Sequence, residues 1–179
     1  MISAAGACVE KINSTISIEV NPSTIKTNES ATMTVEVQGS GIVTITVNGI
    51  KTNVTVDSGV ATLPIEKLAK GTTTITAKYL GDDKYLPSSN ETTVSVSKVD
   101  SFITVSVDNI TVGDKAVIEI TVPGDATGNV TVTVDGNDYN VSVAGGKGIL
   151  VVPDLKAGNY TVDVEYLGDG KYESNVNGT

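Results

Sequence analysis

The sequence predicts an all-β protein made of two tandem Greek-key β-sandwiches. Apolar and polar residues alternate strictly in short segments, Val, Ile, Ser and Thr are abundant, and one pattern recurs after 87 residues. Alternation places apolar side chains on one face of a strand and polar ones on the other. A length of 179 residues fits two domains of about 90 residues each.

The repeat is clearest in the strands. Ile16 and Val20 fall on Ile103 and Val107 after a shift of 87 residues, and the register persists almost to the end of the chain. Only between the first two strands does the offset slip to 85 residues, so that Ile25 falls on Ile110. The dipeptides Asn48-Gly49 and Asp135-Gly136 follow equivalent strands and favour the positive φ angles of a tight hairpin. The first copy is expected to contain seven strands, at 15–20, 31–37, 42–47, 53–56, 61–65, 73–79 and 91–97.

The composition argues against an enzyme. The chain has no His, Arg or Trp, and all twelve of its basic residues are Lys. It therefore lacks an acid/base group that titrates near neutral pH, an imidazole metal ligand and a bidentate clamp for phosphate. The net charge of -9 opposes binding to nucleic acid and to anionic lipid. We therefore expect no catalytic residues, no cofactor and no metal.

One motif ends both copies. Leu68, Gly71, an alternating strand and the sequence from Tyr79 to Tyr85 recur as the stretch from Leu155 to Tyr172. In these features the chain resembles the immunoglobulin-like repeats of bacterial and archaeal adhesin-like surface proteins, especially those of methanogens. The resemblance implies an immunoglobulin-like fold, an extracellular location at the cell surface and a structural or adhesive role.

The Gly-Asp turns of this motif have two interpretations. Their carboxylates resemble calcium ligands, because hard cations need several oxygens. A carboxylate after Gly also caps its own turn, and flanking tyrosines anchor strand ends as tyrosine corners do. We favour the structural interpretation for Tyr79, Asp82, Tyr85, Tyr166, Asp169 and Tyr172.

Nine of the thirteen Asn residues lie in Asn-x-Ser/Thr tripeptides, which are acceptors of N-linked glycans. Strands that are rich in Asn and Thr also generate such tripeptides without selection, so both interpretations stay open. The candidate glycosylation sites are Asn13, Asn28, Asn53, Asn90, Asn109, Asn129, Asn140, Asn159 and Asn177.

A glycan-binding module of a surface protein is the alternative function. Such a module needs aromatic side chains that are exposed together, and this chain has only six Tyr, one Phe and no Trp. Four of the tyrosines belong to the repeated turns. The expected partners are copies of the chain itself or neighbouring immunoglobulin-like modules, with cell-surface glycans as the alternative.

The ends of the chain are out of phase with the repeat. Ala7, Val9 and Ile12 align at the same offset with the last strand of the first copy, whereas the second copy reaches Thr179 before the apolar residues of that strand. We expect residues 1–13 to be an N-terminal strand or linker, 14–99 the first domain and 100–179 the second domain without its last strand. Residues 7–12 are thus a candidate donor strand for head-to-tail assembly into a filament.

Overall fold

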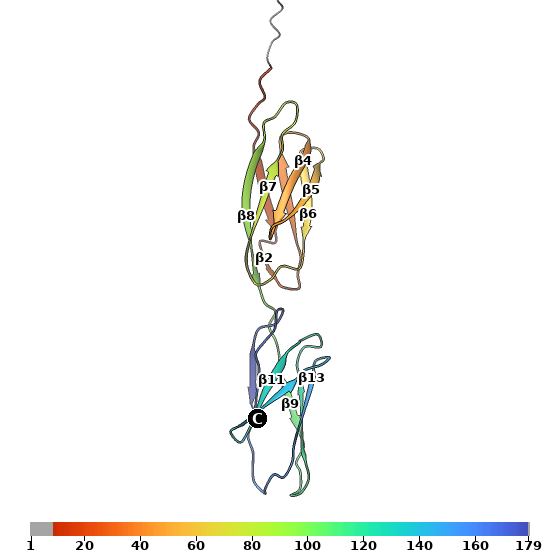
Figure 1. Ribbon diagram of the computed structural model, residues 1–179, viewed down its shortest axis with the longest axis vertical. Coiled ribbons are helices and arrows are strands. Elements are labelled where there is room, and N and C mark those ends of the chain that lie inside the picture. The colour runs from red at the N-terminus through yellow and green to blue at the C-terminus, as the bar shows by residue number, and fades with distance from the viewer. Residues whose placement is uncertain (1–8, 179) are drawn as a thin grey trace, which may run out of the picture. The chain divides into compact units, whose positions relative to one another are not determined.

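The computed structural model of the protein describes residues 9–178 and divides the chain into two units after Ser97. Both units are all-β, and each is an immunoglobulin-like sandwich of two sheets (Figure 1). Within residues 9–178 no helix is long and apolar enough to cross a membrane.

The first unit contains eight strands in two sheets. One sheet has the order β1-β3-β6 and the other has the order β2-β8-β7-β4-β5. The strands are β1 Ile16–Asn21, β2 Thr24–Lys26, β3 Ala31–Val37, β4 Gly41–Val47, β5 Ile50–Val56, β6 Val60–Ile65, β7 Gly71–Tyr79 and β8 Ser88–Ser97.

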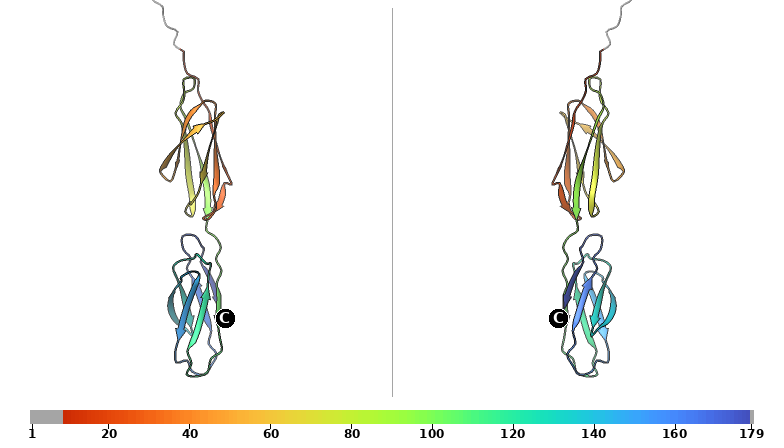
Figure 2. Two further views of the ribbon diagram at one scale, coloured as in Figure 1. Left: turned by 90° about the vertical axis from the view of Figure 1, so that its right-hand side faces the viewer. Right: turned by 90° about the vertical axis from the view of Figure 1, so that its left-hand side faces the viewer.

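The second unit repeats this plan with seven strands in sheets β13-β10-β9 and β12-β11-β14-β15. The sheets of both units can be followed from two sides in Figure 2. The strands are β9 Thr104–Val107, β10 Ala116–Thr121, β11 Asn129–Val134, β12 Asn137–Ser142, β13 Lys147–Val152, β14 Val162–Tyr166 and β15 Asn175–Gly178.

The alternation of apolar and polar residues along the strands places the apolar side chains in the cores. In β3, Met33 and Val35 are fully buried while Thr32 and Glu36 face outward. Side chains from both sheets of a unit join in one apolar cluster, so each sheet covers the inner face of the other. Each unit therefore has a hydrophobic core of its own.

The predicted hairpins are present. Asn48 and Gly49 have φ values of 50° and 80°, and Asp135 and Gly136 have values of 48° and 78°. Because these turns contain only two residues, pairing starts directly beside them, with Val47 opposite Ile50. For this reason β5 begins three residues before the predicted 53–56.

Two strands differ from expectation. β2 was not predicted, because three residues in parallel pairing with β8 leave too short an alternation to recognise. The last strand of the second copy, which was expected to be missing, is present in part as β15. β15 pairs with β14 from Tyr166↔Asn175 to Asp163↔Gly178.

Candidate functional site

The repeated turn of the first unit connects two loops. Tyr79, at the end of β7, is fully buried and donates its hydroxyl hydrogen to the Ser40 carbonyl oxygen at 2.9 Å. One carboxylate oxygen of Asp82 accepts hydrogen bonds from the backbone N–H of Lys84 (2.8 Å) and of Tyr85 (2.7 Å). The other accepts one from the Ser40 N–H at 3.0 Å. The turn is thus fastened to the loop between β3 and β4.

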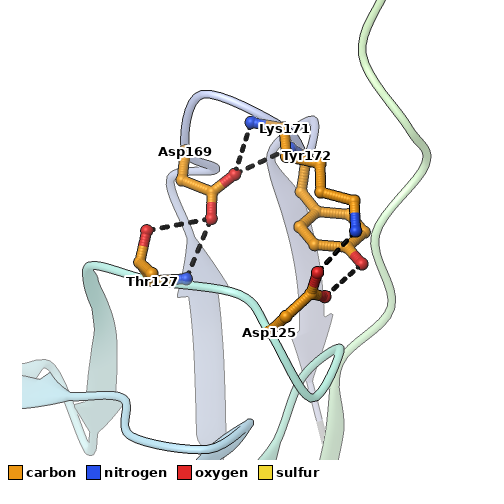
Figure 3. Close-up of polar contacts among 5 residues, drawn as sticks. All are labelled: Asp125, Thr127, Asp169, Lys171 and Tyr172. Carbon is orange, nitrogen blue, oxygen red and sulfur yellow. Dashed lines mark hydrogen bonds and ion pairs between the residues drawn. The ribbon is translucent and has the colours of Figure 1, made fainter. Parts of the chain in front are cut away.

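The second unit has the same arrangement (Figure 3). The Tyr166 hydroxyl donates to the Thr127 carbonyl oxygen at 3.0 Å. Asp169 accepts hydrogen bonds from the Thr127 N–H (2.8 Å) and hydroxyl (3.0 Å), and from the N–H groups of Lys171 (2.8 Å) and Tyr172 (2.7 Å). All six turn residues of the sequence analysis therefore lie in two equivalent networks.

Asp125 extends the network of the second unit. Its carboxylate accepts a hydrogen bond from the Tyr172 hydroxyl at 2.6 Å and forms an ion pair with the Lys171 ammonium. The sequence analysis missed Asp125 because its place in the repeat is taken by Gln38 in the first unit. It also missed Ser40 and Thr127, whose carbonyl groups have no signature in the sequence.

The hydrogen bonds shift the pKa values of both networks. The N–H of Ser40, followed by that of Tyr85, holds the pKa of Asp82 well below its usual range. Burial raises the pKa of Asp169, but the N–H groups of Tyr172, Thr127 and Lys171 outweigh burial and the net pKa is lowered. Burial raises the pKa values of Tyr79 and Tyr166 to about 12.

These networks favour the structural interpretation of the turns. The oxygens that a cation would need already accept backbone hydrogen bonds. In the described part of the chain, no three His, Cys, Asp or Glu side chains group as metal ligands would. The arrangement can therefore hold loops together.

The segment before β1 is tied to the same turn. The Ile12 N–H donates to the Lys84 carbonyl oxygen at 2.8 Å, and the Ile12 carbonyl oxygen accepts from the Leu86 N–H at 2.8 Å. Val99 forms the equivalent pair with Lys171 and Glu173. Ile12 thus belongs to the first unit, whereas Val9 is 89% exposed. Ala7, the third residue of the expected donor strand, lies outside the described residues.

The second unit carries an open groove at one sheet edge. Its volume is about 690 Å³, and it runs between residues 107–112 and 155–162. In the first unit, the equivalent edge is closed because residues 71–74 pair with residues 93–96 of β8. In the second unit, β14 starts at Val162, and residues 158–160 have no strand partner among the described residues, while the Thr161 carbonyl oxygen accepts a hydrogen bond from the Asp135 N–H at 3.4 Å.

Side chains that are buried in the first unit are exposed at this groove. Val107 is 41% exposed and Ile110 is 39% exposed, whereas their counterparts Val20 and Ile25 are 7% and 2% exposed. Val112, at 66%, adds to the exposed apolar surface. The sequence analysis did not identify these three residues as exposed. In the first unit, Ile25 is paired with Val96 of β8, which also lies opposite Gly71.

The candidate glycosylation sites are spread over both units. Eight of the nine Asn side chains are exposed, including Asn53 and Asn140 on strands, and Asn177 is half-buried. The amide nitrogens of Asn90 and Asn177 donate to the carbonyl oxygens of Ile16 and Ile103, at 3.1 and 2.9 Å.

The aromatic side chains do not gather on a surface. Tyr79, Tyr166 and Tyr172 are buried, and the other three tyrosines are half-buried. Phe102 is the one exposed aromatic residue. A platform on which sugar rings could stack is therefore absent from residues 9–178, and this arrangement does not favour the glycan-binding alternative.

Known proteins resemble the chain in fold. The family model of the bacterial Ig-like domain (group 3) matches residues 18–97. The first unit is similar to a bacterial Ig-like domain. No curated protein matches the chain.

Solved structures that are similar to the chain come from proteins of several kinds. The adhesin InvE of Yersinia pseudotuberculosis is 16% identical, with 92% of this chain and 58% of that chain covered and a TM-score of 0.47. The fibronectin(III)-like modules of Clostridium thermocellum CbhA are 15% identical, with 90% of this chain and 91% of that chain covered and a TM-score of 0.38. A β-glucuronidase of Parabacteroides merdae is 12% identical, with 96% of this chain and 24% of that chain covered and a TM-score of 0.38. This chain thus spans just over half of the InvE chain, and at these values the likeness carries no functional argument.

Proposed function

We propose that this chain is a non-enzymatic, extracellular module with a structural or adhesive role in a cell-surface protein. The observation that carries the proposal is the hydrogen bonding of the carboxylates in both Gly-Asp turns. Their carboxylates, the strongest candidates for chemistry in the sequence, are occupied by the hydrogen bonds that hold loops together. The match of residues 18–97 to a bacterial Ig-like domain supports the same role.

The finer parts of the proposal follow from the sequence. The parent protein is an adhesin-like surface protein of the methanogen type, and exposed Asn residues such as Asn53 and Asn140 carry glycans. Their exposure on strands supports this, because a glycan there projects into solvent. Chains also associate head to tail into a filament, with the N-terminal strand of one chain as the donor.

Labelling of intact cells tests the location on which the function depends. Antibodies raised against residues 9–178 should label cells of the source organism that have not been permeabilised, and surface proteolysis should remove the label. Intact mass measurement of the released protein should show added hexose. Labelling that appears only after permeabilisation would contradict the proposed function.

A further inference from the structure

We propose that the free edge of β13 in the second unit binds the same edge of a second copy of this chain, so that two sheets join by antiparallel pairing of their β13 strands. β13 is the outermost strand of its sheet, which has the order β13-β10-β9. The proposal goes beyond the function proposed above, because it depends on strands β10 and β13 and not on residues 7–12.

Hydrogen bonding fixes which backbone groups of β13 point to the free edge. The Val122 N–H donates to the Gly146 carbonyl oxygen at 2.9 Å, and these residues stand opposite each other when the register of β10 and β13 is continued. Hydrogen-bonded and non-hydrogen-bonded pairs alternate in an antiparallel ladder, so every second residue of β13, beginning with Gly148, bonds to β10. The N–H and C=O groups of Ile149 and Val151 therefore point away from β10, and they have no partner within residues 9–178.

The outer face of the sheet is apolar beside this edge. Val151 lies opposite Val117, and Ile149 lies two residues before Val151 on the same face. The exposed fractions of Val151, Val117 and Ile149 are 48%, 44% and 60%. Apart from Lys147 at its start, β13 carries no charged residue. An exposed aliphatic edge of this kind favours pairing with another strand.

The first unit protects its equivalent edge. β6 is the outermost strand of the sheet β1-β3-β6, and it has Thr62 and Pro64 where β13 has Ile149 and Val151. Pro64 has no N–H to donate, and proline within sheets is confined to edge strands and bulges. The two units thus share this strand but differ in whether its edge can accept a partner.

The free groups of β13 match those of a second β13. When two strands pair antiparallel about a two-fold axis at Leu150, Ile149 of each copy stands opposite Val151 of the other. Each of these two pairs exchanges two hydrogen bonds, so the free N–H and C=O groups of both residues are all used. A shifted register would bring in Lys147, whose groups already bond within the preceding turn, or Pro153, which has no N–H.

Charge does not oppose this contact, although the chain has a net charge of -9. Glu119, opposite Ile149, is the only acidic residue in β10 and β13. In the paired sheets the two Glu119 side chains lie at opposite corners, three strand spacings or about 14 Å apart. This distance exceeds the screening length of about 8 Å at physiological ionic strength. The same patch serves both copies, so the contact closes at a dimer.

Sedimentation of the full chain under reducing conditions, which exclude a Cys8 disulfide, tests the association. We expect the mean mass to rise with concentration. Val151→Pro removes a donor from each copy and should weaken the dimer at least about tenfold; Pro64 shows that the strand admits proline at this position. Ile149→Lys should abolish the dimer, whereas Thr62→Lys, the matched change in the first unit, should not.

Two outcomes of this experiment overturn the proposal. One is a wild-type chain that stays monomeric at about 1 mM. The other is unchanged association in the Val151→Pro and Ile149→Lys chains, because association through residues 7–12 would persist in both variants. Both variants should keep the Tm of the second unit to within about 4 °C, since the substituted side chains are exposed.

Hydrogen exchange in the wild-type chain locates the contact. In the dimer the amide hydrogens of Ile149 and Val151 enter hydrogen bonds, so their exchange should slow as the concentration of the chain rises. The Thr62 amide, at the equivalent place in the first unit, is the internal control and should exchange at one rate throughout. The proposal is wrong if the Ile149 and Val151 amides exchange at rates that do not depend on concentration.

Discussion

Tyr79 and Tyr166 link a buried ring to the backbone of a distant loop. Each ring lies inside its core, and each hydroxyl donates to a carbonyl group 39 residues earlier in the chain. The aspartate three residues later holds the N–H groups of the same loop. A tyrosine and an aspartate thus join two loops that the sheets alone would leave apart.

Removal of either hydroxyl should destabilise its own unit. Tyr79→Phe and Tyr166→Phe each remove one hydrogen bond, which costs about 1 kcal/mol and lowers Tm by about 4–8 °C in a domain of this size. Thermal unfolding measures the loss. Tyr139→Phe is the matched control, because the Tyr139 hydroxyl makes no hydrogen bond within residues 9–178. Equal Tm values for all three variants would be incompatible with a role for the two hydroxyls.

The Gly-Asp turns should make the free energy of unfolding depend on pH. The pKa values of Asp82 and Asp169 are lower in the folded chain than in the unfolded chain. Their contribution is therefore fully present above the ordinary Asp pKa of about 4 and is lost as the pH falls below it. Asp82→Asn and Asp169→Asn should flatten the decline of unfolding free energy below about pH 4 in urea titrations. Asp83→Asn is the control at the neighbouring position, and an unchanged decline in the first two variants would refute the assignment.

At the scale of elements, Gly49 and Gly81 are required for different reasons. Gly49 has a φ of +80°, and a Cβ atom added there meets nothing within 4 Å. Gly81 has a φ of +81°, but a Cβ atom there would lie 2.7 Å from the Tyr85 carbonyl oxygen. Gly49 is therefore required only because the hairpin needs a residue in the left-handed conformation. Gly81 is also required because the Asp82 turn leaves no room for a Cβ atom.

Alanine substitutions at Gly49 and Gly81 compare these two requirements within the first unit. Gly49→Ala should cost about 1–2 kcal/mol, because an L-residue is strained at this φ. Gly81→Ala should cost about 1–3 kcal/mol more, because the backbone must shift to admit the methyl group. Urea unfolding of the first unit measures both. If the two losses are equal, the close approach at Gly81 does not matter for stability.

Local patterns predicted part of this architecture. Asn48-Gly49 and the alternation of β3 and β4 depend on neighbouring residues, so the sequence was sufficient for them. The Asp82 turn was predicted, but its partner Ser40 was not, because the contact is to a backbone group 42 residues away. The pairing of β15 with β14 was not predicted, because the four residues Asn175–Gly178 are too short a segment to show an alternation.

At the scale of the whole molecule, both units fasten their Gly-Asp turn in the same way. Asp82 accepts a hydrogen bond from the Ser40 N–H, and Asp169 accepts one from the Thr127 N–H. The second unit adds Asp125, which accepts a hydrogen bond from the Tyr172 hydroxyl and pairs with the Lys171 ammonium. The structural role of the turn therefore applies to each unit by itself.

Thermal unfolding with and without calcium tests the structural role of the turns most directly. We predict the same Tm for both units in excess calcium and in excess chelator, because the turn carboxylates already accept backbone hydrogen bonds. A Tm that falls by more than about 5 °C in chelator, which corresponds to roughly 1 kcal/mol in a domain of this size, would contradict this role and identify the turns as cation sites.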